Sequence, residues 1–305
     1  MNIFLQRQHY LTLGRICYIL NLSIYAAIGE KMSDMVLPPS FEVKRNKIII
    51  PGMTGCFKIM HITDAHVSPD SPLDPEELRE KAAEKRKSAI LGKTGLSHEE
   101  NLNILIEYGK SEGCELFVFS GDVMAFPSEG IVEYLLPIIK ATGEYIFVPG
   151  NHEGGADQFP GYSSLMKQVA PGFEVREYPF FKVIGLDNNG GRLDEAAWEI
   201  LKTSLLGDKP IILVQHRPIT VEPLLTEFRE IHKNVGFYFF GHKDNGYERR
   251  EEILELLRDK DTSLAAVLAG HLHIGHEDNY PNGVPQYVTA PAFEGGARII
   301  EIKGE

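Results

Sequence analysis

The sequence predicts an α/β fold of the mixed, α+β kind, because short apolar runs alternate with helical segments along most of the chain. The clearest apolar run is Leu116-Phe-Val-Phe-Ser120, which lies between Gly113 and Gly121 and is typical of a strand buried on both faces. The run leads into Asp122, and buried parallel strands of open sheets carry ligand-binding groups at this end. On this stretch alone, a turn aspartate that caps the next helix explains Asp122 more simply.

The composition is that of an ordinary globular protein, with 305 residues of which 43% are apolar and 24% charged. The formal net charge of -12 argues against binding nucleic acid or an anionic membrane through bulk charge. A phosphate-bearing substrate stays compatible with that charge, because bound metal cations reverse the sign of a local site. The three cysteines, Cys17, Cys56 and Cys114, are too few for a disulfide framework and suit a reducing compartment or apolar packing.

The N-terminus differs from the rest of the chain, so we expect residues 1–40 to be an appendage and residues 41–305 to form a single domain. The apolar stretch of this appendage is interrupted by polar and charged residues, whereas a membrane span needs about 20 mainly apolar residues. Three alternatives stay open: a signal peptide, an amphipathic helix packed on the body, or a translation start at Met32 or Met35. We expect a cytoplasmic protein, with export or membrane association through residues 1–30 as the alternative.

Strands and helices alternate along the expected domain. Apolar runs between turn residues predict strands over 41–50, 56–63, 116–120, 145–150, 180–186, 209–214, 264–269, 286–290 and 297–302. Periodicity and capping signals predict helices over 74–91, 97–110, 129–141, 162–169, 194–205, 222–232 and 247–258. The helix over 97–110 begins with the capping box Ser97-His-Glu-Glu100, and Asp74 followed by Pro75 opens the helix before it. The last two strands are expected to pair antiparallel.

Potential metal ligands follow five of the predicted strands. The five segments are Asp64-Ala-His66, Gly121-Asp122, Gly150-Asn-His-Glu153, His216-Arg-Pro218 and Gly270-His-Leu-His273. Each has a simple structural explanation when taken alone, since a single histidine at a strand end is usually a turn residue. Residues two apart on a regular strand share a face, so the Asp-x-His and His-x-His pairs could hold one ion or two neighbouring ions. Five such segments at one sheet edge favour a metal site.

The order of these five segments resembles that of the calcineurin-like metallophosphoesterases, over about residues 57–302. The resemblance implies a two-sheet sandwich of mixed β strands flanked by helices, with a dinuclear metal site on loops at one edge. Carried over by position, one metal would be held by Asp64, His66, Asp122 and His273. The other would be held by Asp122, Asn151, His216 and His271, with Asp122 shared. Oxygen and imidazole ligands without thiolate favour two ions of Mn, Fe, Zn or Co over Ca or Mg.

The resemblance also implies the chemistry, in which a hydroxide held by the metals attacks the phosphorus of a small-molecule or nucleotide-type phosphoester. His152 is expected to help the phosphoryl oxygen or leaving group, as a general acid or hydrogen-bond donor. Glu153 either favours protonated His152 or lies on the surface. Arg217 either contacts phosphate or is structural, and His242 either lines the substrate side or belongs to a surface turn.

At two positions the sequence departs from the pattern of particular branches of this family. The segment after Asp122 has no arginine, unlike the serine/threonine phosphatases, and Ala125 stands where purple acid phosphatases have a tyrosine. The sequence therefore favours other phosphodiesterases or phosphomonoesterases and predicts no oligomeric state. An inactive scaffold or binding protein that keeps the fold is one alternative, although its expected mark, a missing ligand, is not found. A nuclease is another, although no basic and aromatic stripe is visible.

Overall fold

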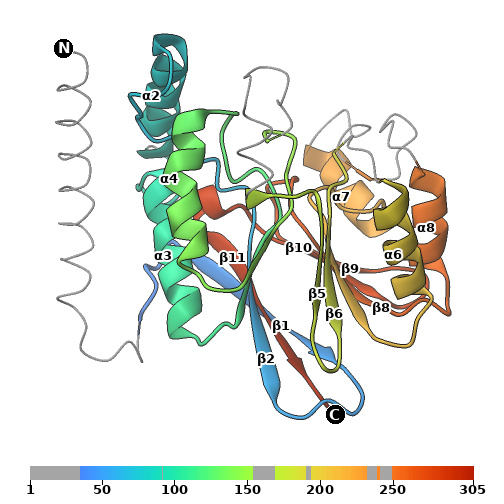
Figure 1. Ribbon diagram of the computed structural model, residues 1–305. Helices are drawn as coiled ribbons and strands as arrows, with labels where there is room; N and C mark the ends of the chain where they lie inside the picture. Colours follow the sequence, from blue (N-terminus) through green and yellow to red (C-terminus); the bar gives the residue numbers. More distant parts are fainter. Residues whose placement is uncertain (1–34, 91, 154–168, 190–193, 232–238, 241–248) are drawn as a thin grey trace, which may run out of the picture. The chain divides into compact units, whose positions relative to one another are not determined.

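The computed structural model describes residues 35–90, 92–153, 169–189, 194–231, 239–240 and 249–305. Residues 37–305 form one compact unit, in which two β-sheets face each other and helices cover their outer faces (Figure 1). This arrangement confirms the predicted α/β fold of mixed type with a two-sheet sandwich flanked by helices. None of the helices in the described ranges has the length and apolar character needed to cross a bilayer.

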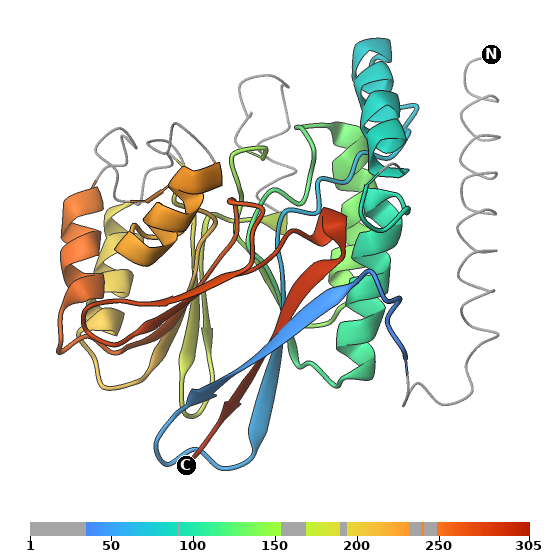
Figure 2. The same ribbon diagram turned by 180° about the vertical axis from the view of Figure 1, so that it is seen from behind.

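The first sheet has five strands and joins the two ends of the domain. In spatial order its strands are β1 (Glu42–Ile49), β11 (Gly296–Lys303), β2 (Cys56–Ile62), β3 (Leu116–Phe119) and β4 (Tyr145–Phe147). The strands β2, β3 and β4 are parallel, so the chain leaves all three at the same edge. β11 runs antiparallel to β2 and parallel to β1, which lies beside it in Figure 2.

The second sheet has six strands. In spatial order they are β5 (Phe173–Glu177), β6 (Lys182–Leu186), β7 (Ile211–Val214), β8 (Leu264–Ala269), β10 (Pro285–Val288) and β9 (His276–Asn279). The four inner strands, β6, β7, β8 and β10, run parallel, whereas the two outermost strands are antiparallel to their neighbours. β7 and β8 therefore deliver the residues that follow them to one edge of this sheet.

Alternating side chains build the layers on either side of the first sheet. Ile59 and Val118 face the second sheet, where they join a buried cluster with Ile212 and Leu268. Met60, the neighbour of Ile59, faces the opposite way and joins the cluster formed with the helices. The helices near this outer face are α2 (Glu76–Ile90), α3 (His98–Ser111) and α4 (Glu129–Lys140).

The remaining helices belong to the second sheet. α6 (Glu195–Leu205) and α8 (Arg250–Arg258) pack on its outer face, and α7 (Glu222–Ile231) packs Leu224 and Phe228 against Leu272 and Val288. A short 3-10 helix, η2 (Ala292–Glu294), lies between β10 and β11. The predicted capping box is confirmed, because the Glu100 N–H donates to Ser97 Oγ over 3.2 Å and the Ser97 N–H donates to Glu100 Oε2 over 2.8 Å.

The sequence analysis was wrong about the last two strands and missed two others. β10 and β11 do not pair, because β10 belongs to the second sheet and β11 is an inner strand of the first. β5 and β9 were not predicted; both lie at sheet edges, where their polar sequences Phe-Glu-Val-Arg-Glu and His-Glu-Asp-Asn need no continuous apolar run. The helix predicted over 162–169 falls outside the described residues, apart from Val169.

Candidate metal centre

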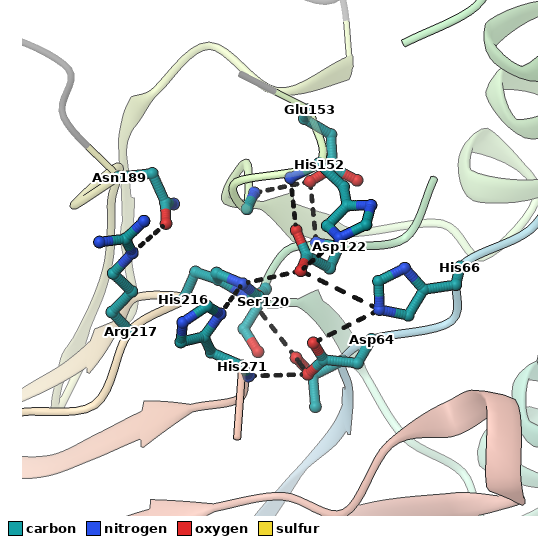
Figure 3. A network of polar contacts seen from close by, with 12 residues as sticks. Asp64, His66, Ser120, Asp122, His152, Glu153, Asn189, His216, Arg217 and His271 are labelled. Carbon is teal, nitrogen blue, oxygen red and sulfur yellow. Dashed lines mark hydrogen bonds and ion pairs between the residues drawn. The ribbon is translucent and has the colours of Figure 1, made fainter. Parts of the chain in front are cut away.

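The strand ends of both sheets bring most of the predicted metal ligands together (Figure 3). Asp64 and His66 follow β2, and Asp122 follows β3. His216 follows β7, and His271 follows β8. Figure 3 shows Asp122 between His66 and His216, so the carboxylate from the end of β3 occupies the middle of the cluster. The parallel strands thus deliver their end residues to one place, as the fold class predicts.

Hydrogen bonds fix these loops against one another. The backbone N–H of Asp64 donates to Gly121 O, and that of His66 donates to Asp122 O, each over 2.9 Å. The two sheets are linked in the same way, because the His271 N–H donates to Asp64 Oδ2 over 2.8 Å. His216 Nδ1 lies 2.7 Å from Ser120 O, so it can donate to this carbonyl and leave Nε2 facing Asp122.

Backbone strain concentrates at the predicted ligands. Among the described residues, six other than glycine have a positive φ, and the four from paired motifs are Asp64 (51°), His66 (47°), His271 (71°) and His273 (54°). Asp122 (50°) is the fifth, so only one of the six lies elsewhere in the fold. The left-handed region costs a non-glycine residue about 1–2 kcal/mol. This cost is tolerated where surrounding contacts impose the conformation, as at functional sites.

The paired motifs therefore do not act as regular strand residues. Both Asp64 and His66 lie beyond the last residue of β2, and left-handed backbone rather than strand alternation directs them to one group. His271 and His273 behave differently, since each joins a different group. Asp64 and His66 thus share a group with His273, whereas His271 belongs to a different group.

Three overlapping groups of potential ligand atoms result. The first contains Asp64, His66 and His273, and the second contains Asp122, His216 and His271. The third contains His66, Asp122 and His152, so it shares one residue with each of the others. Within each group one ligand atom per residue lies within 4.8 Å of the others. Nitrogen atoms come especially close, since His66 Nε2 is 3.2 Å from His273 Nε2 and His271 Nδ1 is 3.0 Å from His216 Nε2.

The donor set fits a divalent cation. Asp64 Oδ1 is buried and has no hydrogen-bond donor among the described residues, although His273 Nε2 lies 3.4 Å away. Leaving a carboxylate oxygen buried without a donor is costly, and a cation would satisfy it. Carboxylate oxygen and imidazole nitrogen without sulfur form a donor set that suits Mn, Fe, Zn and Co. The residues present therefore match the metal chemistry that the sequence predicts.

The protonation states also suit ligation. Burial alone would raise the pKa of Asp64, but the nearby His273 imidazole and the charge of His216 lower it to about 2. Burial lowers the pKa of His66 to about 3, and burial followed by the charge of His216 lowers that of His271. Ionised carboxylates and neutral imidazoles are the forms that bind metals.

The charge of the Asp122 carboxylate is balanced by a proton on His216. Burial opposes the charge of His216, but the Asp122 carboxylate, 3.2 Å from His216 Nε2, raises its pKa to about 9. Burial likewise works against the ionisation of Asp122, and the charge of His216 holds the Asp122 pKa far below its usual range. A cation here would replace this proton, since metal binding to such residues releases protons.

His152 is oriented by the loop that carries Asp122. Its backbone N–H donates to Asp122 Oδ1 over 2.8 Å, and its Nδ1 lies 2.7 Å from Ala125 O. Donation from Nδ1 to that carbonyl leaves Nε2 turned toward Asp122 Oδ2, at 4.0 Å. About a third of the side chain, 34%, is exposed, so this nitrogen is accessible to a ligand. Asn151, the preceding residue, is exposed at the same turn.

Glu153 is buried and does not lie on the surface, which was one of the two alternatives for it. Its Oε2 accepts hydrogen bonds from the backbone N–H groups of Asp122 and Gly150, over 2.8 and 2.6 Å. Its Oε1 accepts from the Met124 N–H over 2.8 Å. Burial, followed by the charge of Asp122, raises its pKa to about 7. Glu153 therefore joins the loop after β3 to the loop after β4.

Arg217 is held by a pair of asparagines that the sequence analysis did not single out. Its Nε donates to Asn189 Oδ1 over 3.0 Å, and its backbone N–H donates to Asn188 Oδ1 over 3.0 Å. Both asparagines lie in the turn after β6, separated from its end by one residue, so the signal was a pair of amides near another parallel strand end. His242, the remaining candidate, lies outside the described residues.

Comparisons with known proteins agree with this geometry. A family model described as calcineurin-like phosphoesterase matches residues 57–275. No curated protein matches the chain in sequence.

Several solved structures resemble the fold. A dimetal phosphatase from Danio rerio is 15% identical, with 78% of this chain and 88% of that chain covered and a TM-score of 0.42. A protein of Thermus thermophilus is 11% identical, with 78% and 91% covered and a TM-score of 0.43. A phosphopantetheinyl hydrolase from Mycobacterium tuberculosis is 14% identical, with 78% and 90% covered and a TM-score of 0.41. At these identities and TM-scores, the likenesses carry no conclusion about activity.

Proposed function

The chain belongs to the calcineurin-like phosphoesterase family, and from this premise we propose that it is a hydrolase of small-molecule phosphoesters that depends on two metal ions. One observation supports the proposal above the others. A single oxygen, Asp122 Oδ2, lies 3.2 Å from His216 Nε2, in the group with His271, and 4.0 Å from His66 Nε2, in the group with Asp64 and His273. This carboxylate can therefore serve both groups, as a shared ligand of a two-metal site must.

The proposed assignment follows the first two groups. Asp64, His66, Asp122 and His273 would hold one ion, and Asp122, Asn151, His216 and His271 would hold the other. When bound, the ions would supply positive charge for the phosphoryl oxygens and an activated water as nucleophile. Asp64 and Asp122 balance that charge inside the protein, where both are buried.

The other residues have separate roles in this proposal. His152 would donate a hydrogen bond from Nε2 to a phosphoryl oxygen or to the leaving oxygen. The contact of its Nδ1 with Ala125 O supports this role, because it fixes the plane of the ring. Glu153 would position the loop that carries Asp122, through its hydrogen bond with the backbone of that loop. Arg217 would also act as a positioning residue, through its hydrogen bond with Asn189.

The test combines metal content with activity. Asp122→Asn should lose bound metal and the turnover of an activated aryl phosphate, because an amide lacks the negative charge with which the carboxylate balances the positive charge of the metal ions. The matched control is Asp70→Asn, which removes an exposed carboxylate paired with Arg79 and should change neither property. Unchanged turnover in Asp122→Asn would refute the proposal. A panel of aryl mono- and diesters with added Mn²⁺ then distinguishes monoester from diester hydrolysis.

A further inference from the structure

We propose that the cavity between α2 and η2 binds a planar heteroaromatic group of the substrate, of which a nucleobase is the common biological form. This inference rests on the proposed function, since the metal centre would hold the phosphate of the same molecule. The cavity has a volume of about 300 Å³. That volume is at the lower end of the range for small-molecule sites, about 300–1,000 Å³.

The cavity opens directly onto the metal centre. His66, His152 and His273 line one part of it, and Lys85, Phe293 and Glu294 line another. A substrate whose phosphate lies among the imidazoles can therefore extend its organic part toward Phe293. Because His152 belongs to the lining, an ester oxygen at this junction would also lie beside the proposed proton donor.

Phe293 offers a rigid aromatic surface. Its backbone N–H donates to Asp64 O over 3.1 Å, and its carbonyl accepts from Asn101 Nδ2 over 2.8 Å. Its ring centroid lies 5.0 Å from that of His273 and 5.4 Å from that of His98. A ring fixed on the backbone side and only half-buried is suited to stacking against a planar group.

The charged residues of the cavity favour a group with both donors and acceptors. Lys85 presents an ammonium group and Glu294 a carboxylate, and both residues are half-buried. Neither side chain has an ion-pair or hydrogen-bond partner within the described ranges. A heteroaromatic ring carrying an acceptor for Lys85 and a donor for Glu294 would satisfy both, whereas a plain alkyl or phenyl group would satisfy neither.

The binding test uses adenosine, which carries the base without a phosphate and so needs no catalysis. Saturation-transfer NMR on the full chain should show transfer to the base protons, and Phe293→Leu and Lys85→Ala should each weaken adenosine binding. Stacking losses on alanine substitution correspond to a weakening of about 5- to 150-fold, and we expect Phe293→Leu to fall in the lower part of this range because leucine keeps an apolar contact. The matched controls are Phe180→Leu and Lys87→Ala, which change exposed residues of the same types outside the cavity lining.

The kinetic test compares adenosine 5′-monophosphate with ribose 5-phosphate. The wild-type kcat/KM should favour the nucleotide, and Phe293→Leu should reduce this preference. If adenosine does not bind, or if the Phe293 and Lys85 variants bind it like the controls, the inference is refuted. Equal turnover of both esters refutes the inference and leaves the proposed function standing. Adenosine binding without turnover of any ester supports the cavity assignment and refutes the proposed function.

Discussion

Glu153 offers a sharp test of how the candidate centre is held together. Its carboxylate accepts hydrogen bonds from three backbone N–H groups, those of Asp122, Met124 and Gly150. Two of the donors belong to the loop after β3 and one to the loop after β4. Glu153→Ala removes all three hydrogen bonds at once without changing any predicted metal ligand. The variant therefore measures the support of the centre separately from its ligands.

The expected loss of stability in Glu153→Ala follows from the three backbone donors that it leaves without a partner. A buried donor left without a partner costs about 1–3 kcal/mol. The lower value applies here, because the variant also relieves the burial of a carboxylate whose pKa is raised to about 7. Three donors at this value predict a loss of about 3 kcal/mol in the free energy of unfolding. Metal affinity should fall as well, because Asp122 is then held less firmly.

The assay is urea unfolding in the presence of a chelator, so that metal binding does not contribute to stability. The control is Glu99→Ala, because Glu99 Oε1 accepts from one backbone amide, Ser68 N–H, over 2.6 Å. We expect a loss of about 1 kcal/mol for this single donor. Glu153→Gln should recover only part of the loss, since its NH₂ group cannot accept a hydrogen bond. Equal losses in the two alanine variants would refute the reasoning.

Two further predictions concern histidines with different roles. His152→Ala should retain bound metal and lower kcat by about 10²- to 10⁴-fold, the usual contribution of a proton donor, when measured with an aryl phosphate beside metal analysis; loss of metal would instead identify His152 as a ligand. His61 is buried, where its Nε2 lies 2.7 Å from Ser120 Oγ, and burial followed by the charge of Arg298 lowers its pKa from 6.5 to about 3. The folded state keeps His61 neutral, so the associated stability is present above pH 6.5 and is lost as the pH falls toward 3. Between pH 7 and about pH 4, wild type should lose about 3 kcal/mol more unfolding free energy than His61→Gln; parallel pH profiles in urea unfolding would contradict this.

The buried strands could be predicted because their signal is local. β3 and β7 are continuous apolar runs between turn residues, and burial on both faces demands such runs. The edge strands β5 and β9 lack this signal, since only one neighbour covers each of them. The pairing of strands was harder to predict than their positions, because β11 lies in the first sheet beside β1 and β2, which are more than 200 residues earlier in the chain. No local pattern records which sheet such a strand joins.

The ligand residues could be predicted because each stands at a strand end, and the edge of a parallel sheet gathers such positions. The contacts of Glu153 could not be predicted in this way. Its position after His152 suggested either an imidazole partner or a surface residue, but its carboxylate contacts backbone amides of another loop. Asn188 and Asn189 stand at a strand end too, but amides there are common turn residues. Their role at the site is to accept hydrogen bonds from Arg217, which is distant in sequence.

The backbone at the ligands explains why sequence propensity could not supply the geometry. Left-handed conformations favour glycine, yet Asp64, His66, Asp122, His271 and His273 all adopt them. Glycine would relieve the strain but would remove the side chain that the centre needs. The strain is instead held by hydrogen bonds between loops, such as Asp64 N–H to Gly121 O and His271 N–H to Asp64 Oδ2. Because these bonds join segments that follow different strands, the geometry of the centre depends on both assembled sheets, and no single motif can specify it.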